Sequence, residues 1–528
     1  MAASSQFSYP VGAVFVFNLV VGTGSLSMPN AFGSAGYLLG IIVICVIYFI
    51  SYVSVTFMTE SLAVANAVVS RAKTVPRNTG DQLLLFNEAG SDTDYSTVRG
   101  RRRLENEDVP LLPNEDPDDY HSPSTGIDSM SVSGSYLRRE NILVSDEDKM
   151  SELSSQIESA FEIKQKFEMG ELCKLFAGSQ LWTIFFYICI SIYLYGDLAI
   201  YAAAVPKSVR DVICSNLSGY DTMSNSDPCW PDSASITRIN VYRCILAVFI
   251  STFGIFAFFE VSKTMVLQIC TGLIRWTSFL MMVILAIMQI AKGEGVAQPP
   301  TAVKFDGLFG LFGVLIYSFM CHHSVPTLIM PLKEKRYAKE MLLVDYTLAL
   351  FFYLINSVVA VFAFKDLEDL YSENFVSINI PNGCKYFIGL FPALVLCTSF
   401  PIIAVVLRNN LKALFRQLLG RPAFPFLIDR IVFPSACLVV PLIVAMITDD
   451  VTSLMKVTGG LSGGFIEFFF PALIVYFARQ KVQQLQEGNS SFQVPKYVKS
   501  YFQSVWFVYM VFAWTAICLI MTIVGFFY

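Results

Sequence analysis

The sequence contains about eleven separate apolar stretches, each long enough to cross a lipid bilayer, because a spanning helix needs roughly 20 apolar residues. Charged residues make up only 15% of the 528 residues, whereas soluble domains contain about 25%. Phenylalanine (45) and tyrosine (24) are abundant, as at lipid-facing and interfacial positions. We therefore expect an all-α polytopic membrane protein with about eleven transmembrane helices.

The apolar stretches divide the chain into membrane helices and two long polar loops. Residues 66–178 hold 21 acidic and 13 basic residues, a net charge of −8, which leaves +3 for the remainder of the total of −5. This segment has too few apolar residues to offset the entropy of ordering, so most of it is expected to be disordered. The predicted order is helices 1 and 2 in 1–65, an acidic, largely disordered cytosolic loop in 66–179, helix 3 in 180–205, a lumenal or extracellular loop in 206–238, and helices 4 to 11 in 239–528.

The first apolar stretch, from Val11 to Phe32, is expected to form a helix that breaks in the middle. It contains Gly22 and Gly24, and a glycine costs about 1 kcal/mol in a helix interior. Pro29 follows; proline lacks a backbone donor, and its ring clashes with the preceding turn. A break in hydrocarbon leaves backbone groups unpaired, which is tolerated only inside protein or against a polar cavity. Broken helices near the bilayer midplane point to the binding sites of transporters.

A second break is expected in the sixth apolar stretch, from Asp306 to Pro331. Its centre reads YSFMCHHSVPTLIMP, in which His322 and His323 precede Pro326. If helices 1–5 and 6–10 are two copies of one unit, this helix is the counterpart of the first. The odd number of helices then inverts the second copy in the membrane. The sequence predicts a 5+5 inverted repeat with broken helices 1 and 6, plus an eleventh helix.

The two breaks together form the predicted substrate site. The second half of helix 1 starts near Gly24, where free N–H groups and the positive end of the helix dipole favour a carboxylate. Glycine also lets a ligand approach the backbone closely. The predicted substrate is therefore a small amino acid-like molecule. The expected substrate-binding residues are Gly22, Thr23, Gly24, Ser25, Ser318, His322 and His323.

The histidine pair His322–His323 has several interpretations. It packs as polar residues beside the break, contacts substrate, or binds a proton near neutral pH. A zinc site would need more ligands at metal spacing, and the twelve cysteines lack the spacing of such sites. No metal or other cofactor is therefore expected.

Polar residues at membrane depth are candidates for binding a coupling ion, with Na+ and H+ both left open. Asp197 lies well inside helix 3, where a carboxylate costs about 2.5–3.5 kcal/mol and needs a partner or a function. Both proton or cation coupling and a structural pair are retained for it. Thr398 and Ser399 in helix 8 either bond back to their own helix or give an oxygen to a cation. Arg275 and Glu467 are interpreted as ties between helices.

Basic residues predict the orientation, because cytoplasmic loops carry an excess of Lys and Arg. The turns after helices 6, 8 and 10 carry the basic clusters. The N-terminus and the acidic loop are then cytosolic, and the C-terminus is lumenal or extracellular. On that outer side we expect glycosylation of Asn216 and a disulfide between Cys214 and Cys229, with Cys384 as a rival partner.

A sorting pattern occurs in the acidic loop. Glu107 followed by Leu111 and Leu112 fits the acidic dileucine pattern that sorting adaptors bind. This pattern favours a lysosomal or endosomal membrane, and the plasma membrane is the alternative.

The string NLVVGTG, from Asn18 to Gly24 in the first helix, resembles a motif of the amino acid/auxin permease family, in the amino acid–polyamine–organocation superfamily. The string from Asn18 to Gly24, NLVVGTG, matches an Asn followed by Gly-Ser-Gly in that family's sodium-coupled neutral amino acid transporters. The resemblance implies an inverted-repeat fold and amino-acid transport. It also implies that Asn18 matches a sodium-coordinating asparagine, and that Ser399 matches a threonine of the eighth helix. Longer strings, including FNLVVGTGSLSMPNAF and FPIIAVVLRNN, resemble an atypical branch of this family, whose substrate the resemblance does not supply.

The sequence as a whole predicts a secondary active transporter that moves an amino acid or a related small solute by alternating access. The alternative is a non-transporting solute sensor or membrane scaffold that signals through the acidic loop. An enzyme is not expected, because the polar loops lack a nucleophile–base pair, a metal cluster and a phosphate loop. The expected partners are the substrate, the lipid bilayer and sorting adaptors, and nucleic acid is not among them.

Overall fold

The structure is a computed structural model that describes residues 8–74, 159–214, 224–230, 235–259, 265–421, 423–488, 493–525 and 527. Within these ranges the chain is mostly helical and has no β-strand, and an isolated antiparallel bridge joins Pro228 and Thr237. Ten helices of the described part are long and apolar enough to cross a membrane, and a bent helix pair raises the number of spans to 11. The predicted all-α polytopic membrane fold is confirmed.

The spans follow one another in chain order. The first five are α1 (Tyr9–Val20) with α2 (Gly24–Ala35), α3 (Tyr37–Thr74), α8 (Gln180–Ile213), α9 (Arg238–Phe253) with η2 (Gly254–Phe258), and α10 (Met265–Ala291). The sixth consists of η3 (Phe305–Gly307), α11 (Leu308–Phe319), η4 (His322–Ser324) and α12 (Val325–Ile329). The next three are η5 (Lys335–Tyr337) with α13 (Ala338–Ala363), α15 (Asn382–Leu419), and η7 (Ile428–Val432) with α16 (Phe433–Ile447). The last two are α17 (Val451–Val457), η8 (Thr458–Gly463), η9 (Phe465–Phe469) and α18 (Phe470–Gly488) as one span, and α19 (Val505–Gly525) as the other.

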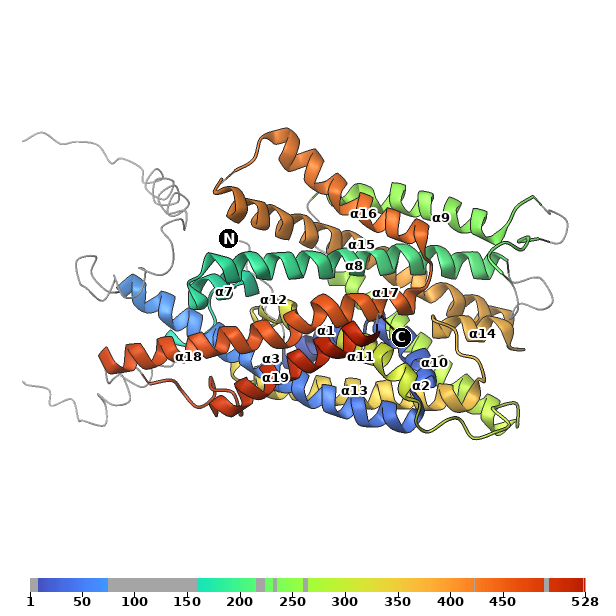
Figure 1. Cartoon of the computed structure of the whole chain (residues 1–528), viewed down its shortest axis with the longest axis horizontal. Coiled ribbons are helices and arrows are strands. Elements are labelled where there is room, and N and C mark those ends of the chain that lie inside the picture. Colours follow the sequence, from blue (N-terminus) through green and yellow to red (C-terminus); the bar gives the residue numbers. More distant parts are fainter. Residues whose placement is uncertain are drawn as a thin grey trace, which may run out of the picture.

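The spans run along the long axis of the molecule (Figure 1). One end of the bundle, on the left in Figure 1, carries α7 (Met169–Ala177) and the far ends of α3 and α18; we call it the loop end. The opposite end carries α14 (Asn374–Ser377) and the connection from α8 to α9; we call it the disulfide end. Large apolar side chains such as Val248, Leu280 and Trp506 remain exposed, as expected of a surface that contacts lipid.

Two spans extend past the ends predicted from hydropathy. α3 continues beyond residue 65 to Thr74, and α8 continues beyond residue 205 to Ile213. The extension of α8 is held by Arg210, whose guanidinium bonds to Asp211 and, at 2.8 Å, to Asp449. Helices therefore run through the predicted boundaries at 65/66 and 205/206, because polar contacts outside the apolar stretch stabilise the added turns.

The final part of the predicted acidic loop is ordered. α7 begins with a capping box. The Glu168 side chain accepts the backbone N–H of Glu171, and the Glu171 side chain accepts the backbone N–H of Glu168. The Asn66 side chain in α3 bonds to the backbone of Lys164 and Gln165. α7 in turn packs on α8 and α18. The acidic loop, predicted to be largely disordered, is thus ordered at residues 159–179, while residues 75–158 lie outside the described ranges.

Both predicted breaks are present. α1 and α2 are separated by Val21–Thr23 and meet at an angle of 49°. In the sixth span, α11 ends at Phe319, and the single-turn η4 follows before α12. The 5+5 inverted repeat stays a prediction, to which the matching positions of the two breaks lend support.

Candidate functional site

The break in the first span leaves backbone carbonyls without the partners that a continuous helix would give them. Val21 has φ −79° and ψ 70°, outside the helical region, and the Gly22 N–H donates to the Val20 carbonyl at 2.8 Å. The Ser25 hydroxyl donates to the Gly22 carbonyl at 2.6 Å. The carbonyls of Asn18 and Val21 are bonded instead by a side chain from another span, Arg275. The break is thus stabilised by tertiary contacts.

Tyr353 of α13 connects the two broken spans. Its buried hydroxyl lies 2.7 Å from the Val20 carbonyl of the first span and 3.0 Å from the Ser318 carbonyl of the sixth. Gly24 lies directly against Ser318, since a Cβ added to Gly24 would be 2.1 Å from the Ser318 Oγ. The first turn of α2 and the last turn of α11 therefore meet at van der Waals distance, and only glycine fits between them.

Asp197 joins the third span to both broken spans. Its buried carboxylate accepts a hydrogen bond of 2.5 Å from the Tyr317 hydroxyl of α11. Tyr201, one turn further along α8, interacts with the side chains of both Asp197 and Thr23. Among the described residues no cation forms an ion pair with Asp197. The carboxylate is therefore held by hydroxyl groups of α8 and α11.

α13 brings two polar residues to the first break that the sequence reading did not single out. The Asn356 amide donates to the Ser25 carbonyl at 3.3 Å. Asn356 and Ser357 are fully buried, and the Asn356 Oδ1 and Ser357 Oγ have no hydrogen-bond partner among the described residues. An Asn-Ser pair inside an apolar helix is the sequence signal that identifies them, because polar groups at membrane depth need a partner or a function.

The histidine pair lies in η4, beside a second buried carboxylate. His322 Nε2 is 3.2 Å from the Ser51 carbonyl, and the Ser51 hydroxyl donates to Glu467 at 2.5 Å. The ring of His323 lies 5.7 Å from that of Tyr193. The Nδ1 atoms of both histidines lack a hydrogen-bond partner within the described residues. The pair therefore packs between spans 2, 3 and 10, and Glu467 ties spans 2 and 10 together.

Thr398 and Ser399 of α15 form hydrogen bonds within their own helix. Both hydroxyls donate to the Val395 carbonyl in the preceding turn, at 2.7 Å and 3.2 Å. Asn18, the other expected sodium ligand, has a buried Oδ1 with no partner in the described chain. The hydroxyl hydrogens of Thr398 and Ser399 thus point to their own helix, and the predicted sodium ligands stay a prediction.

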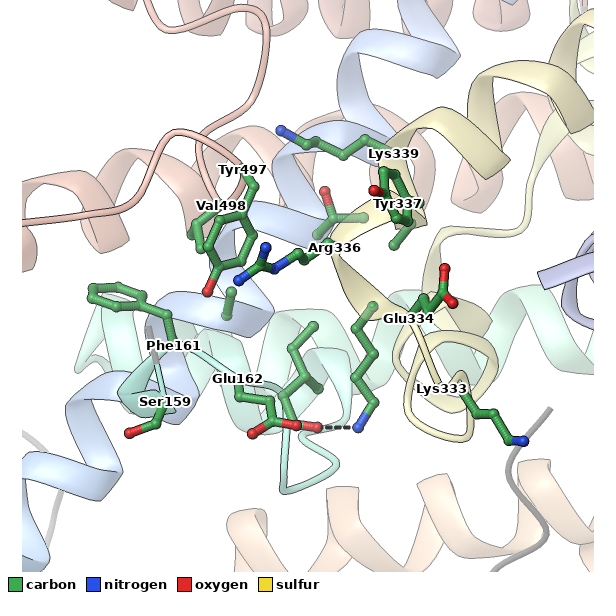
Figure 2. A pocket seen from close by; sticks show the side chains of 15 residues that line it. Ser159, Phe161, Glu162, Lys333, Glu334, Arg336, Tyr337, Lys339, Tyr497 and Val498 are labelled. Carbon is green, nitrogen blue, oxygen red and sulfur yellow. Dashed lines mark hydrogen bonds between the residues drawn. The ribbon is translucent and has the colours of Figure 1, made fainter. Parts of the chain in front are cut away.

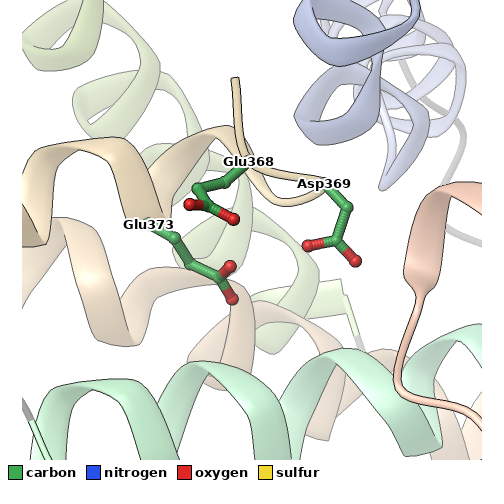
Figure 3. Close-up of side chains that lie close together, drawn as sticks. All are labelled: Glu368, Asp369 and Glu373. Atoms are coloured by element: carbon green, nitrogen blue, oxygen red, sulfur yellow. The ribbon is translucent and has the colours of Figure 1, made fainter. Parts of the chain in front are cut away.

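The disulfide end is closed by the segment between α13 and α15, where Asp369 contacts three spans. The Asp369 carbonyl accepts Ser27 of α2 at 2.7 Å, and its carboxylate accepts the Val451 N–H of α17 at 2.9 Å. Lys207 of α8 forms a hydrogen-bonded ion pair with Asp369, and its Nζ lies 3.7 Å from a carboxyl oxygen of Glu373. Figure 3 shows Glu368, Asp369 and Glu373 gathered beside α8. Burial raises the pKa of Glu373 well above its usual range, although Lys207 opposes this shift.

The loop end has a cavity of about 460 Å³ (Figure 2). It lies between α3, the ordered end of the acidic loop and the start of α13. Lys335 closes one side by donating to the Ile163 carbonyl at 2.6 Å, and the Arg336 guanidinium lies over the Tyr497 ring. This cavity is separate from the two breaks, and its walls hold the ordered end of the loop against the bundle.

The remaining predicted sites fall at the loops. Cys214 and Cys229 form a disulfide, and Cys384 is free. Asn216 and the dileucine residues Glu107, Leu111 and Leu112 lie outside the described ranges.

Comparison with known proteins places these features in a family. The family described as transmembrane amino acid transporter protein matches residues 164–524. The chain belongs to this transmembrane amino acid transporter family. The matched residues include the third span with Asp197, the sixth span with its histidine pair, and Arg275.

Relatives of this family member match over nearly its whole length. Transmembrane protein 104 of Gallus gallus is 38% identical over 96% of this chain and 93% of its own. Transmembrane protein 104 homolog of Drosophila melanogaster is 33% identical over 99% of this chain and 98% of its own. Transmembrane protein 104 homolog of Dictyostelium discoideum is 29% identical over 98% of this chain and 96% of its own. The long loop after the second span thus lies within a chain of the same overall extent as these relatives.

Proposed function

We propose that this protein is a secondary active transporter that carries an amino acid or a related small zwitterion by alternating access. The observation that supports this most directly is the contact between the two broken spans at Gly24 and Ser318. Irregular backbone at membrane depth is tolerated where it is buried in protein or lines a cavity, and transporters bind substrate at such breaks. Membership of a transmembrane amino acid transporter family supports the same function.

In this proposal the substrate carboxylate binds at the N-terminus of α2. The N–H groups of Ser25 and Leu26 donate to the Gly22 and Thr23 carbonyls at 3.3 Å and 3.0 Å in the present conformation. The helix dipole favours an anion at this end, which a substrate carboxylate would approach as the break rearranges. The buried Asn356 Oδ1 and Ser357 Oγ lie on the adjoining span and supply further polar contacts. Ser318 fills the space beside Gly24 in the present conformation, so substrate entry requires the sixth span to move relative to the first.

We assign the coupling ion as H+, bound at Asp197. Its carboxylate contacts Tyr317 of the sixth span and, through Tyr201, Thr23 of the first. A proton there changes the hydrogen bonds of both spans that must move. His322 and His323 remain candidate substrate contacts beside the second break.

Uptake by purified protein in proteoliposomes tests the proposal. A pool of labelled amino acids is offered with and without imposed Na+ and pH gradients. We expect accumulation driven by a pH gradient. The test variant is Gly22→Val, because a Cβ added to Gly22 would meet only the Leu19 and Val20 carbonyls, at 3.5 Å and 4.0 Å. The matched control is Gly383→Val, because Gly383 has open space around it.

Gly22→Val should abolish uptake while both variants remain folded in the membrane, and Gly383→Val should transport normally. Loss of folded Gly22→Val protein would indicate a packing role for the break. Ligand-dependent thermal stabilisation without any accumulation would contradict transport and identify the solute sensor instead.

We further propose the topology and destination of the chain. The loop end faces the cytosol, and the disulfide end with glycosylated Asn216 faces the lumen or the exterior, where disulfides form. Glu107, Leu111 and Leu112 direct the protein to lysosomes or endosomes through sorting adaptors. Unchanged localisation after replacement of Leu111 and Leu112 by Ala would rule out this signal.

A further inference from the structure

Arg275 of α10 is bound by the backbone of the broken first span. Its Nη1 donates to the Asn18 carbonyl and, at 2.8 Å, to the Val21 carbonyl. These are carbonyls that the end of α1 and the break leave without ordinary helical partners. The adjacent Trp276 ring stacks on Phe17 at 4.4 Å and fixes α10 against α1 at this level.

The charge of Arg275 is balanced by dipoles instead of by a carboxylate. Among the described residues no Asp or Glu forms an ion pair with it. The ionisable groups that interact with it electrostatically are the hydroxyls of Tyr201 and Tyr353. The C-terminus of a helix carries about half a negative charge on its unpaired carbonyls, which stabilises a cation there. Arg275 therefore lies where α1 presents negative potential.

In transporters with a broken helix, unwound carbonyls and a helix C-terminus together coordinate Na+. The carbonyls of Asn18 and Val21 are of this kind. A guanidinium within hydrogen-bond distance of these oxygens excludes a metal ion from them.

The close approach of α10 leaves room for the guanidinium and little else. A Cβ added to Gly272 would lie 2.4 Å from the Asn18 amide nitrogen. Gly272 is one helical turn before Arg275, so the glycine brings α10 close enough for the arginine to reach both carbonyls.

We infer that Arg275 is a built-in cation that takes the place of Na+ at the broken first span, so that the protein closes this span without sodium. The inference rests on the proposed transport function only in treating the break as the coupling site. It makes Arg275 a positioning residue, and it departs from the sodium dependence that the motif beginning at Asn18 implies.

Thermal unfolding of the purified full-length protein tests the inference without measuring transport. The Tm is compared in NaCl, KCl and choline chloride at equal ionic strength, for the wild type and for Arg275→Met, Arg275→Lys and Arg243→Met. Arg243 is an exposed arginine of α9 and serves as the matched control. Ethylguanidinium at a low, fixed concentration is the probe for rescue.

We expect the wild-type Tm to be the same in the three salts. Arg275→Met should lower it by about 5 °C, Arg275→Lys by less, and ethylguanidinium should restore most of the loss in Arg275→Met alone. Arg243→Met should respond to neither change. A Na+-specific rise in the wild-type Tm would overturn the inference, and this measurement holds even if Arg275→Met does not fold. An unchanged Tm in Arg275→Met would also overturn it.

These outcomes are separate from those of the uptake experiment. Sodium-driven uptake would contradict the inference while supporting transport. A protein that binds solute without moving it would contradict transport while leaving the role of Arg275 intact.

Discussion

The Tyr317 hydroxyl donates a hydrogen bond of 2.5 Å to the carboxylate of Asp197, which joins the sixth span to the third inside the bundle. Both side chains are buried, and Tyr201 extends the contact to Thr23 at the break of the first span. A change of charge on this one carboxylate is therefore felt at both broken spans.

Replacing Asp197 by Asn should separate proton coupling from folding. Asn keeps the size of the side chain and its contact with Tyr317 but cannot bind and release a proton. We expect the variant to fold, and to lose accumulation driven by a pH gradient while retaining exchange of solute. Proteoliposome uptake across a series of imposed pH gradients measures this, and normal pH dependence in Asp197→Asn would show that the residue is structural.

The fit of Gly24 against Ser318 predicts a steric effect. Gly24→Ala should destabilise the protein by about 1–3 kcal/mol, because overpacking a tight contact forces backbone shifts. Ser318→Gly in the same chain should restore part of the loss, since it removes the Oγ and Cβ atoms that the new methyl group meets and leaves the Cα at 3.0 Å. Gly383→Ala, with open space around it, is the control. Equal unfolding temperatures for Gly24→Ala and Gly383→Ala would refute the packing argument.

The pair of carboxylates at Lys207 should differ in their contribution to stability. Asp369→Asn breaks an ion pair whose side chains are 12% and 13% exposed, so it should cost somewhat less than the roughly 3–5 kcal/mol of a fully buried pair. Glu373→Gln should cost much less, because burial raises the pKa of Glu373 and favours its neutral form. The ranking of the two variants by Tm at neutral pH is the measurement, and a larger loss for Glu373→Gln would contradict it.

The raised pKa of Glu373 also predicts a dependence on pH. A carboxyl whose pKa is higher in the folded than in the unfolded chain binds its proton more tightly when folded, so its contribution to stability falls as pH rises above the ordinary value of about 4.3. Tm measured from acid to neutral pH should therefore decline less in Glu373→Gln than in the wild type. Parallel curves for the two proteins would exclude Glu373 as the source.

The disulfide at the end of α8 should stabilise the folded chain. The two cysteines are 15 residues apart, and closing a loop of that length contributes about 3 kcal/mol in the chain-entropy description. Cys229→Ser should lower the Tm to about that of the reduced wild type. Cys384→Ser should leave the Tm unchanged, and a loss in that variant would indicate an alternative pairing.

The span pattern and the first break could be predicted because each depends on local chemistry. Long apolar stretches must satisfy the hydrogen bonds of their own backbone in lipid, so they form helices. Gly22, Gly24 and Pro29 weaken a helix in any surroundings. The disulfide between Cys214 and Cys229 follows from short spacing in one loop. The ends of α3 and α8 were predicted too early, because the contacts of Asn66 and Arg210 that extend them come from distant residues.

The contacts around the break could not be predicted in the same way. Arg275 and Tyr353 are far from Val20 and Val21 in the chain, and nothing in their local sequence indicates that they bond to those carbonyls. Asp369 likewise lies in an ordinary polar connection until the fold brings Lys207 beside it.

The sequence by itself determined that this chain crosses a membrane about eleven times and where its first helix breaks, since hydropathy and backbone propensity act over a few residues. Only the tertiary structure decided what the break binds. Hydrogen bonds act over about 3 Å, so the partner of each freed carbonyl is whichever side chain the packing of the other spans brings there. In this structure Arg275 is the partner of the Asn18 and Val21 carbonyls, and Tyr353 is the partner of the Val20 carbonyl.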